Sequence, residues 1–132
     1  MKTLLLLFLA VLSIFPTAHA SAHTCFLSSK VLINVANNLP PMSRLTIHCA
    51  SGDDELGFHT LSVNEQFHWK FCAGLRTLFF CHLWWEHKQK AFDVFKAKSF
   101  IYSGYFWSAS NDGIYLSHDN KTFTKKFEWE SY

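Results

Sequence analysis

The chain has 132 residues, of which 49% are hydrophobic, 17% aromatic and 17% charged. This length and composition fit one small domain and exclude a multidomain enzyme, a coiled coil, a collagen and a disordered tail. The formal net charge of only +2 argues against bulk nucleic-acid binding, which needs a basic face.

The first twenty residues have the pattern of a secretory signal peptide. A short basic start precedes an apolar run from Leu4 to Phe15, and Ala18-His19-Ala20 forms a small-x-small cleavage site. The run is shorter than the roughly 20 residues of a membrane-spanning helix, which disfavours a membrane anchor. We therefore expect residues 1–20 to be removed and residues 21–132 to form a secreted, extracellular domain with no membrane span.

The rest of the chain alternates apolar and polar residues with a period of two, which is typical of β-strands. Strands are expected over Lys30–Asn37, Leu45–Cys49, Leu61–Val63, Gln66–Phe71, Thr77–Glu86, Ala91–Ala97, Tyr105–Ala109, Gly113–Ser117 and Thr122–Trp129. The almost wholly apolar run Thr77–Glu86 is expected to be a central strand packed on both faces. Turns are expected at Asn37–Pro41, Ser51–Gly57, His87–Lys90, Asn111–Gly113 and His118–Lys121. The sequence thus predicts an all-β fold of eight to nine short strands, as a sandwich or a small barrel.

All four cysteines, Cys25, Cys49, Cys72 and Cys81, follow the expected cleavage site. An even number of cysteines in a small exported domain indicates two disulfide bonds. Four cysteines allow three pairings, and the residues alone leave all three open.

No residue pattern indicates a catalytic or metal centre. The sequence has no G-x-S-x-G nucleophile elbow, and its acidic residues 53–55 are neighbours in a turn rather than carboxylates opposed across a cleft. His82 and His87 lie near Cys81, yet a zinc site needs three or four converging ligands. We therefore expect no enzyme activity, no metal and no cofactor.

Two features are expected at the surface. Trp84 and Trp85 are adjacent on one strand and must point to opposite faces, so one belongs in the core and the other is either core or an exposed platform for sugar or a partner. Asn120-Lys121-Thr122 is an N-glycosylation sequon in an expected hairpin turn. We expect a glycoprotein with its glycan on Asn120.

Eight stretches of the chain also occur together in a distinctive order. They are Val31–Val35, Asn38–Leu39, Leu45–Cys49, Asp53–Gly57, Phe67–Phe71, Thr77–Trp85, Ala91–Phe95, and Trp107 with Asp112–Tyr115. Together they resemble the plant self-incompatibility S-protein homologue family. The resemblance implies a small secreted β-sandwich of two antiparallel sheets, stabilised by disulfides. It also implies a bond between Cys49 and Cys81, which leaves Cys25 to pair with Cys72.

The resemblance further implies a function in cell–cell signalling. The best-known members are secreted by the stigma, bind a pollen membrane receptor and distinguish incompatible from compatible pollen. We expect a non-enzymatic ligand that binds a cell-surface receptor through loops between strands. Those loops are Asn38–Arg44, Ser51–Gly57, Ala73–Arg76 and His87–Lys90, and the candidate contact residues are Asp53, Asp54, Glu55, Lys88 and Lys90. The alternative is a wall-associated, lectin-like module that binds sugar on an exposed tryptophan.

Overall fold

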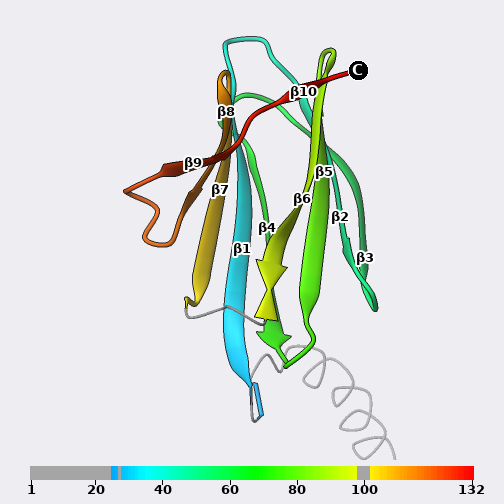
Figure 1. Ribbon diagram of the computed structural model, residues 1–132, viewed down its shortest axis with the longest axis vertical. Helices are drawn as coiled ribbons and strands as arrows, with labels where there is room; N and C mark the ends of the chain where they lie inside the picture. The colour runs from blue at the N-terminus through cyan, green and yellow to red at the C-terminus, as the bar shows by residue number, and fades with distance from the viewer. Residues whose placement is uncertain (1–24, 27, 98–101) are drawn as a thin grey trace, which may run out of the picture.

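The structure is a computed structural model that describes residues 25–26, 28–97 and 102–132, so the expected signal peptide lies outside the described residues. The strands are β1 (Ser29–Asn38), β2 (Leu45–Ser51), β3 (Glu55–Leu61), β4 (Gln66–Ala73), β5 (Leu78–Trp85), β6 (Lys88–Lys96), β7 (Gly104–Ser110), β8 (Gly113–Ser117), β9 (Thr124–Phe127) and β10 (Glu130–Ser131). They form two five-stranded sheets that face each other, with strand orders β4-β1-β7-β8-β9 and β10-β6-β5-β2-β3 (Figure 1).

The core lies between the two sheets and is built from alternate strand positions, as the period of two predicts. In β1, the side chains of Val31, Ile33 and Val35 are fully buried. In the opposite sheet, Ile47 and Leu83 are also fully buried. The sandwich of short strands is therefore confirmed, and the small barrel is excluded because the two sheets stay separate.

Two features of the strand arrangement were not predicted from the sequence. β1 and β7 pair in parallel, from Leu32 opposite Gly104 to Asn38 opposite Ser110, whereas the other neighbouring strands pair antiparallel. The strand expected over Thr122–Trp129 is the shorter β9 in the first sheet, and β10, which was not expected, follows in the second sheet. The chain crosses between the sheets here, where the indole nitrogen Nε1 of Trp129 donates to the Ser110 carbonyl at 2.7 Å.

The expectation that β5 is packed on both faces is wrong. Its inward residues Phe79, Cys81, Leu83 and Trp85 are buried, but Phe80 on the outer face is 41% exposed. No other strand of the described chain lies over this face. From the sequence alone, an apolar run without alternation has the same pattern whether the strand is covered on both faces or has one solvent-exposed face rich in aromatic residues.

The strands gather the loops at two ends of the sandwich (Figure 1). The upper end holds the β1–β2, β3–β4, β5–β6 and β7–β8 connections, and the lower end holds the β2–β3 and β4–β5 connections. β5 has 8 residues, so the two ends lie roughly 25 Å apart at about 3.3 Å per residue.

One carboxylate organises the β8–β9 loop. Asp119 Oδ1 accepts hydrogen bonds from the backbone amides of Lys121 and Thr122, each at 2.9 Å, and from the Ser117 hydroxyl at 2.8 Å. These donors, the Thr122 amide foremost, lower the pKa of Asp119 from 3.8 to about 2.

We expect an Asp119→Asn variant to be less stable than the wild type at neutral pH and to approach it as the solution is acidified. The pKa of Asp119 is lower in the folded state, so its stabilisation is present above pH 3.8 and is lost as the pH falls toward about 2. Guanidinium unfolding midpoints of both proteins at neutral pH, near pH 4 and near pH 2 measure this effect. A difference between the proteins that stays constant over this range would contradict it.

Candidate functional site

The five predicted contact residues lie at two ends of the sandwich rather than in one patch. Asp53 and Asp54 lie in the β2–β3 turn and Glu55 begins β3, all at the lower end. Lys88 and Lys90 lie in β6 beside the upper end, in a strand rather than in the expected turn. A single loop surface cannot include all five, because the strands separate them.

The two lysines pack against the sandwich. The Lys88 ammonium lies 4.8 Å from the centre of the Trp85 ring. The Lys90 ammonium lies 3.4 Å from Glu130 Oε2 and 5.4 Å from the centre of the Phe127 ring. The aliphatic parts of both lysine side chains cover aromatic rings, and both ammonium groups already have interaction partners within the protein. Lys88 and Lys90 are therefore poorer candidates for receptor contact than the lower-end acids.

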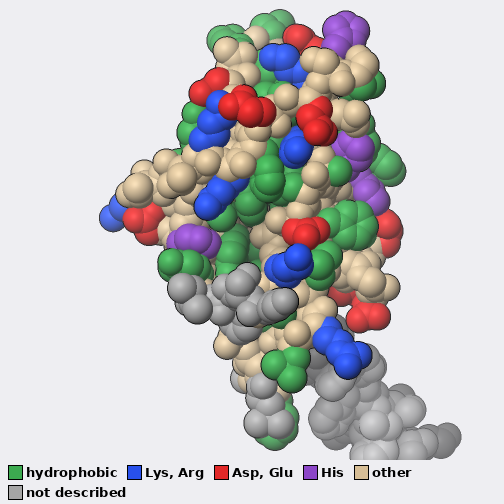
Figure 2. Space-filling view, in the orientation of Figure 1, with side chains coloured by type: hydrophobic (Ala, Val, Ile, Leu, Met, Phe, Trp, Pro, Cys, Tyr) green, Lys and Arg blue, Asp and Glu red, His purple; other side chains and the backbone are tan. Residues whose placement is uncertain are grey.

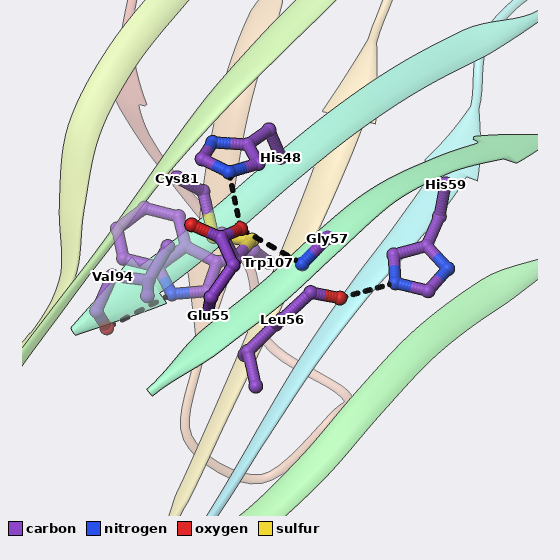
Figure 3. The surroundings of a disulfide bond; sticks show 9 residues. His48, Glu55, Leu56, Gly57, His59, Cys81, Val94 and Trp107 are labelled. Carbon is purple, nitrogen blue, oxygen red and sulfur yellow. Dashed lines mark hydrogen bonds and ion pairs between the residues drawn. A yellow bond between two sulfur atoms is a disulfide. The ribbon is translucent and has the colours of Figure 1, made fainter. Parts of the chain in front are cut away.

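Glu55 is fixed against the second sheet (Figure 3). Its carboxylate accepts a hydrogen bond from the Gly57 amide at 2.9 Å and contacts the His48 ring nitrogen Nε2. The Gly57 amide, followed by the His48 ring, holds the pKa of Glu55 below its usual value. The Glu55 carboxylate therefore closes a local turn. The carboxylates of Asp53 and Asp54 are the acidic groups of this loop that no such contact holds in place.

A disulfide lies directly behind this turn. Cys49 and Cys81 are opposite each other on β2 and β5, with Cα atoms 4.1 Å apart, and both are fully buried. The second disulfide joins Cys25, which precedes β1, to Cys72 near the end of β4. Both disulfides thus fasten the strands that carry the lower-end loops.

At the lower end, the β2–β3 and β4–β5 loops meet around a hollow of about 380 Å³. Residues 51–54 line one side, Arg76 and Thr77 line the other, and Phe71 and Phe79 lie between them. Figure 2 shows acidic and basic side chains gathered at the lower right, where β2 and β3 meet. The structure therefore brings together two of the four predicted recognition loops.

Hydroxyl groups hold the backbones of both lower loops. Ser51 Oγ accepts from the amides of Asp53 and Asp54 at 3.3 and 3.0 Å. Thr77 Oγ1 accepts from the Gly74 amide at 2.8 Å. Such side-chain turns fix loop conformation without help from a strand ladder, so the lower end is preorganised.

The functional side chains of these loops point to solvent. Within the part of the chain that the structure describes, the charged groups of Asp53, Asp54 and Arg76 form no hydrogen bond or ion pair with other side chains. Leu75, which precedes Arg76 in the β4–β5 loop, is 97% exposed. Leu75 and Arg76 were not singled out from the sequence, because nothing in a short polar loop marks which of its side chains remain unpaired.

The outer face of the second sheet carries a further cluster, which we call the outer aromatic face: His48, Phe58, His82 and Trp84. The His82 ring stacks on Trp84 with centroids 3.8 Å apart, and Phe58, which is 69% exposed, lies 5.9 Å from Trp84. Trp85 points the other way and is 6% exposed. Only Trp84 of the predicted pair is therefore available as a platform.

Among the described residues, no group of three or more His, Cys, Asp or Glu side chains is arranged to hold a metal ion. No helix in the same residues has the length and apolarity needed to cross a membrane.

Comparisons with known proteins place this chain in a family. Residues 32–129 match the sequence profile of the "Plant self-incompatibility protein S1" family. The chain is 36% identical to S-protein homolog 29 of Arabidopsis thaliana over 107 residues, covering 76% of this chain and 78% of the relative. It is 33% identical to S-protein homolog 18 of the same plant over 95 residues, covering 69% of each chain.

A solved structure shares the fold. It superimposes with a TM-score of 0.67 at 21% sequence identity and covers 80% of this chain and 98% of the other. That protein is a self-incompatibility protein homologue, from "a widespread family of small, highly stable, secreted proteins from plants". The sequence resemblance is confirmed, and the chain belongs to the plant self-incompatibility protein S1 family.

Proposed function

We propose that this protein is a secreted, non-enzymatic signalling ligand that binds a cell-surface receptor through the lower end of its sandwich. The observation that carries the proposal is the convergence of two rigid loops around the lower hollow, with Asp53, Asp54 and Arg76 unpaired and Leu75 exposed. Arginine is among the residue types that most often anchor an interface, the exposed leucine adds apolar contact area beside it, and unpaired charges steer a complementary partner.

The framework supports the same function. Two disulfides and a side-chain-locked turn on each loop limit the conformational entropy that the loops would lose on binding. Secretion agrees with the expected signal peptide and with the pairing of all four cysteines, since disulfides persist in oxidising compartments. Family membership adds the setting of plant cell–cell communication.

We expect an Asp53→Lys/Asp54→Lys double variant to bind plant protoplasts at least tenfold more weakly than the wild type. Reversing both charges places like charges against a partner that complements the acidic loop, and a tenfold loss is about 1.4 kcal/mol of binding free energy. Saturation binding of fluorescently labelled protein to protoplasts, which lack a wall, measures the effect.

Glu86→Lys provides a control for charge reversal elsewhere on the molecule, because it changes an exposed acid at the upper end. Glu86→Lys shifts the net charge by half as much as the double variant, so a loss of binding free energy about half as large would show that binding depends on net charge rather than on the lower end. Binding to protoplasts that does not saturate would refute a receptor.

A wall-associated lectin is the second candidate, supported by the outer aromatic face. Trp84 with the exposed ring of Phe58 offers an apolar surface flanked by polar groups, which is the composition of sugar platforms. Under this alternative, Trp84→Ala lowers retention on isolated wall polysaccharide while the Asp53/Asp54 double variant is retained like the wild type. Trp85 is not a platform on this reading, because it is buried.

A further inference from the structure

A second hollow, of about 200 Å³, lies on the outer face of the first sheet. Four side-chain amides and two aromatic rings contribute to its lining: Asn34, Asn38, Asn64, Gln66, Phe106 and Phe123. Asn120, the acceptor of the sequon, belongs to the same lining. None of these residues contributes to the lower-end site, which lies around the β2–β3 and β4–β5 loops.

The amides of this hollow are only partly satisfied. Asn38 Nδ2 donates to Ser108 Oγ at 2.6 Å. Within the described residues, the side chains of Asn34 and Gln66 form no hydrogen bond with another protein group, although Asn34 is only 7% exposed. Neither amide is buried and unsatisfied, because within the described residues that state is found only at the indole nitrogens of Trp69 and Trp85. The amide groups of Asn34 and Gln66 are therefore accessible, and they can pair with a ligand that supplies both donors and acceptors.

The lining also sets the chemical class of that ligand. Amide side chains pair with hydroxyl and acetamido groups, and aromatic rings offer an apolar surface to the carbon-bound hydrogens of a sugar ring. Pockets for drug-sized ligands are roughly 300–1,000 Å³, and this hollow is smaller, so it fits one monosaccharide unit rather than an oligosaccharide.

Asn120 is held at the rim of this hollow. The Asp119 carboxylate fixes the loop by accepting from the amides of Lys121 and Thr122. Asn120 itself has a φ of 60°, a left-handed conformation that asparagine tolerates better than most residues. A sugar attached to Asn120 Nδ2 therefore begins beside the lining that suits it.

We propose that the first N-acetylglucosamine of a glycan on Asn120 folds back into this hollow, packs on Phe123 and hydrogen-bonds the free amides of Asn34 and Gln66. The glycan comes from a lipid-linked diphosphate donor. The bond from Asn120 Nδ2 to C1 of the sugar forms as the bond from C1 to the diphosphate oxygen breaks, and a proton of Nδ2 leaves with the diphosphate. The hollow is thus an intramolecular sugar site that stabilises the fold, and this role is independent of receptor binding.

Two variants at one position test the proposal in protein secreted from eukaryotic cells. Thr122→Ser keeps the sequon, whereas Thr122→Ala removes it, and both keep the backbone amide that Asp119 holds. We expect the mass of Thr122→Ser to show a glycan on Asn120. We also expect its guanidinium midpoint to exceed that of Thr122→Ala by about 0.3 M, the shift that about one added hydrogen bond gives in a small domain.

A second pair of measurements locates the stabilising sugar. An endoglycosidase that leaves one N-acetylglucosamine on Asn120 should preserve the higher midpoint. In a Phe123→Ala background, the difference between the two Thr122 variants should fall below about 0.1 M, because the stacking surface is gone. Phe123 is 38% exposed, so its truncation leaves the core intact.

Three outcomes would overturn the proposal. The first is an unmodified Asn120 in the secreted protein. The second is equal midpoints for Thr122→Ser and Thr122→Ala, which would mean that the glycan extends into solvent. The third is a gain in midpoint that disappears on trimming or persists in Phe123→Ala, which would assign the stabilisation to outer sugars or to another surface.

Discussion

Replacing Cys49 and Cys81 together by alanine is expected to lower the free energy of unfolding by about 4 kcal/mol. The bond joins residues 32 positions apart, and the chain-entropy model assigns roughly 3.7 kcal/mol to the freedom that such a bond removes from the unfolded chain. Both cysteines are fully buried, so losing their sulfur atoms also removes core contacts. β2 and β5 stay paired in the native state, so the folded chain gains little freedom that would offset the loss.

The Cys25→Ala/Cys72→Ala variant is the matched comparison, and we expect it to lose about 2 kcal/mol. Its loop is longer, with a separation of 47 residues, so the unfolded-state contribution alone is about 4 kcal/mol. However, Cys25 and Phe26 precede β1, and Phe26 is 87% exposed. Breaking this bond frees a short segment in the folded state as well, and each freed residue regains roughly 1–2 kcal/mol of backbone entropy.

Guanidinium unfolding followed by tryptophan fluorescence, without reductant, measures both double variants. A second readout is the order in which dithiothreitol reduces the native protein. The Cys25–Cys72 bond should open first, because Cys72 is exposed whereas Cys49 and Cys81 are not. A larger stability loss in Cys25→Ala/Cys72→Ala than in Cys49→Ala/Cys81→Ala would contradict the assignment of the main constraint to the core disulfide.

The strands could be predicted because a half-buried strand leaves a period-two pattern in its own sequence. How strands pair leaves no such local trace. The parallel pairing of β1 with β7 joins residues about 70 positions apart in the chain, and the pattern within each strand is the same whichever neighbour it takes. β10 was missed because its two exposed residues carry no periodic pattern, and its pairing with β6 in the second sheet again joins distant parts of the chain.

Two of the predicted contact residues, Lys88 and Lys90, lie in a strand rather than in the expected turn, for a physical reason. A polar stretch such as His87–Lys90 fits a turn, but it also fits a strand whose long side chains lie along rings, as Lys88 does on Trp85. The hairpin turn needs only Glu86 and His87, with Glu86 at a φ of 54°. The sequence therefore predicted an acidic loop, but not which charges the fold would neutralise.

The three surfaces of the molecule differ in what they can contact. The first sheet presents amides beside the sequon, the second presents the outer aromatic face, and the lower end presents unpaired charges on rigid loops. A glycan seated on the first sheet would cover that face. The lower end and the outer aromatic face would then remain for partners, and the protoplast and wall-binding experiments separate these two.

Asn37→Ala is expected to lower the free energy of unfolding by about 3 kcal/mol, because this fully buried amide supports the upper end from within. Asn37 Oδ1 accepts from the Leu39 amide at 3.0 Å, and Nδ2 donates to the Leu61 carbonyl at 2.9 Å. Alanine leaves both backbone groups without their partner. Each unsatisfied buried group costs roughly 1–3 kcal/mol. The sequence places Asn37 at the boundary between an expected strand and an expected turn, and nothing in that pattern marks its side chain as buried.

The neighbouring Asn38 makes the comparison specific. Asn38 is exposed and its amide donates to Ser108 Oγ, so Asn38→Ala should lose less than about 1 kcal/mol. Asn37→Asp should lose at least as much as Asn37→Ala, because a carboxylate cannot donate to the Leu61 carbonyl and is buried without a cation. Guanidinium unfolding of the three variants, all made without a glycan, gives the ranking. Equal losses for Asn37→Ala and Asn38→Ala would mean that the β1–β2 loop is held by its two prolines and backbone contacts, and that the buried amide is dispensable.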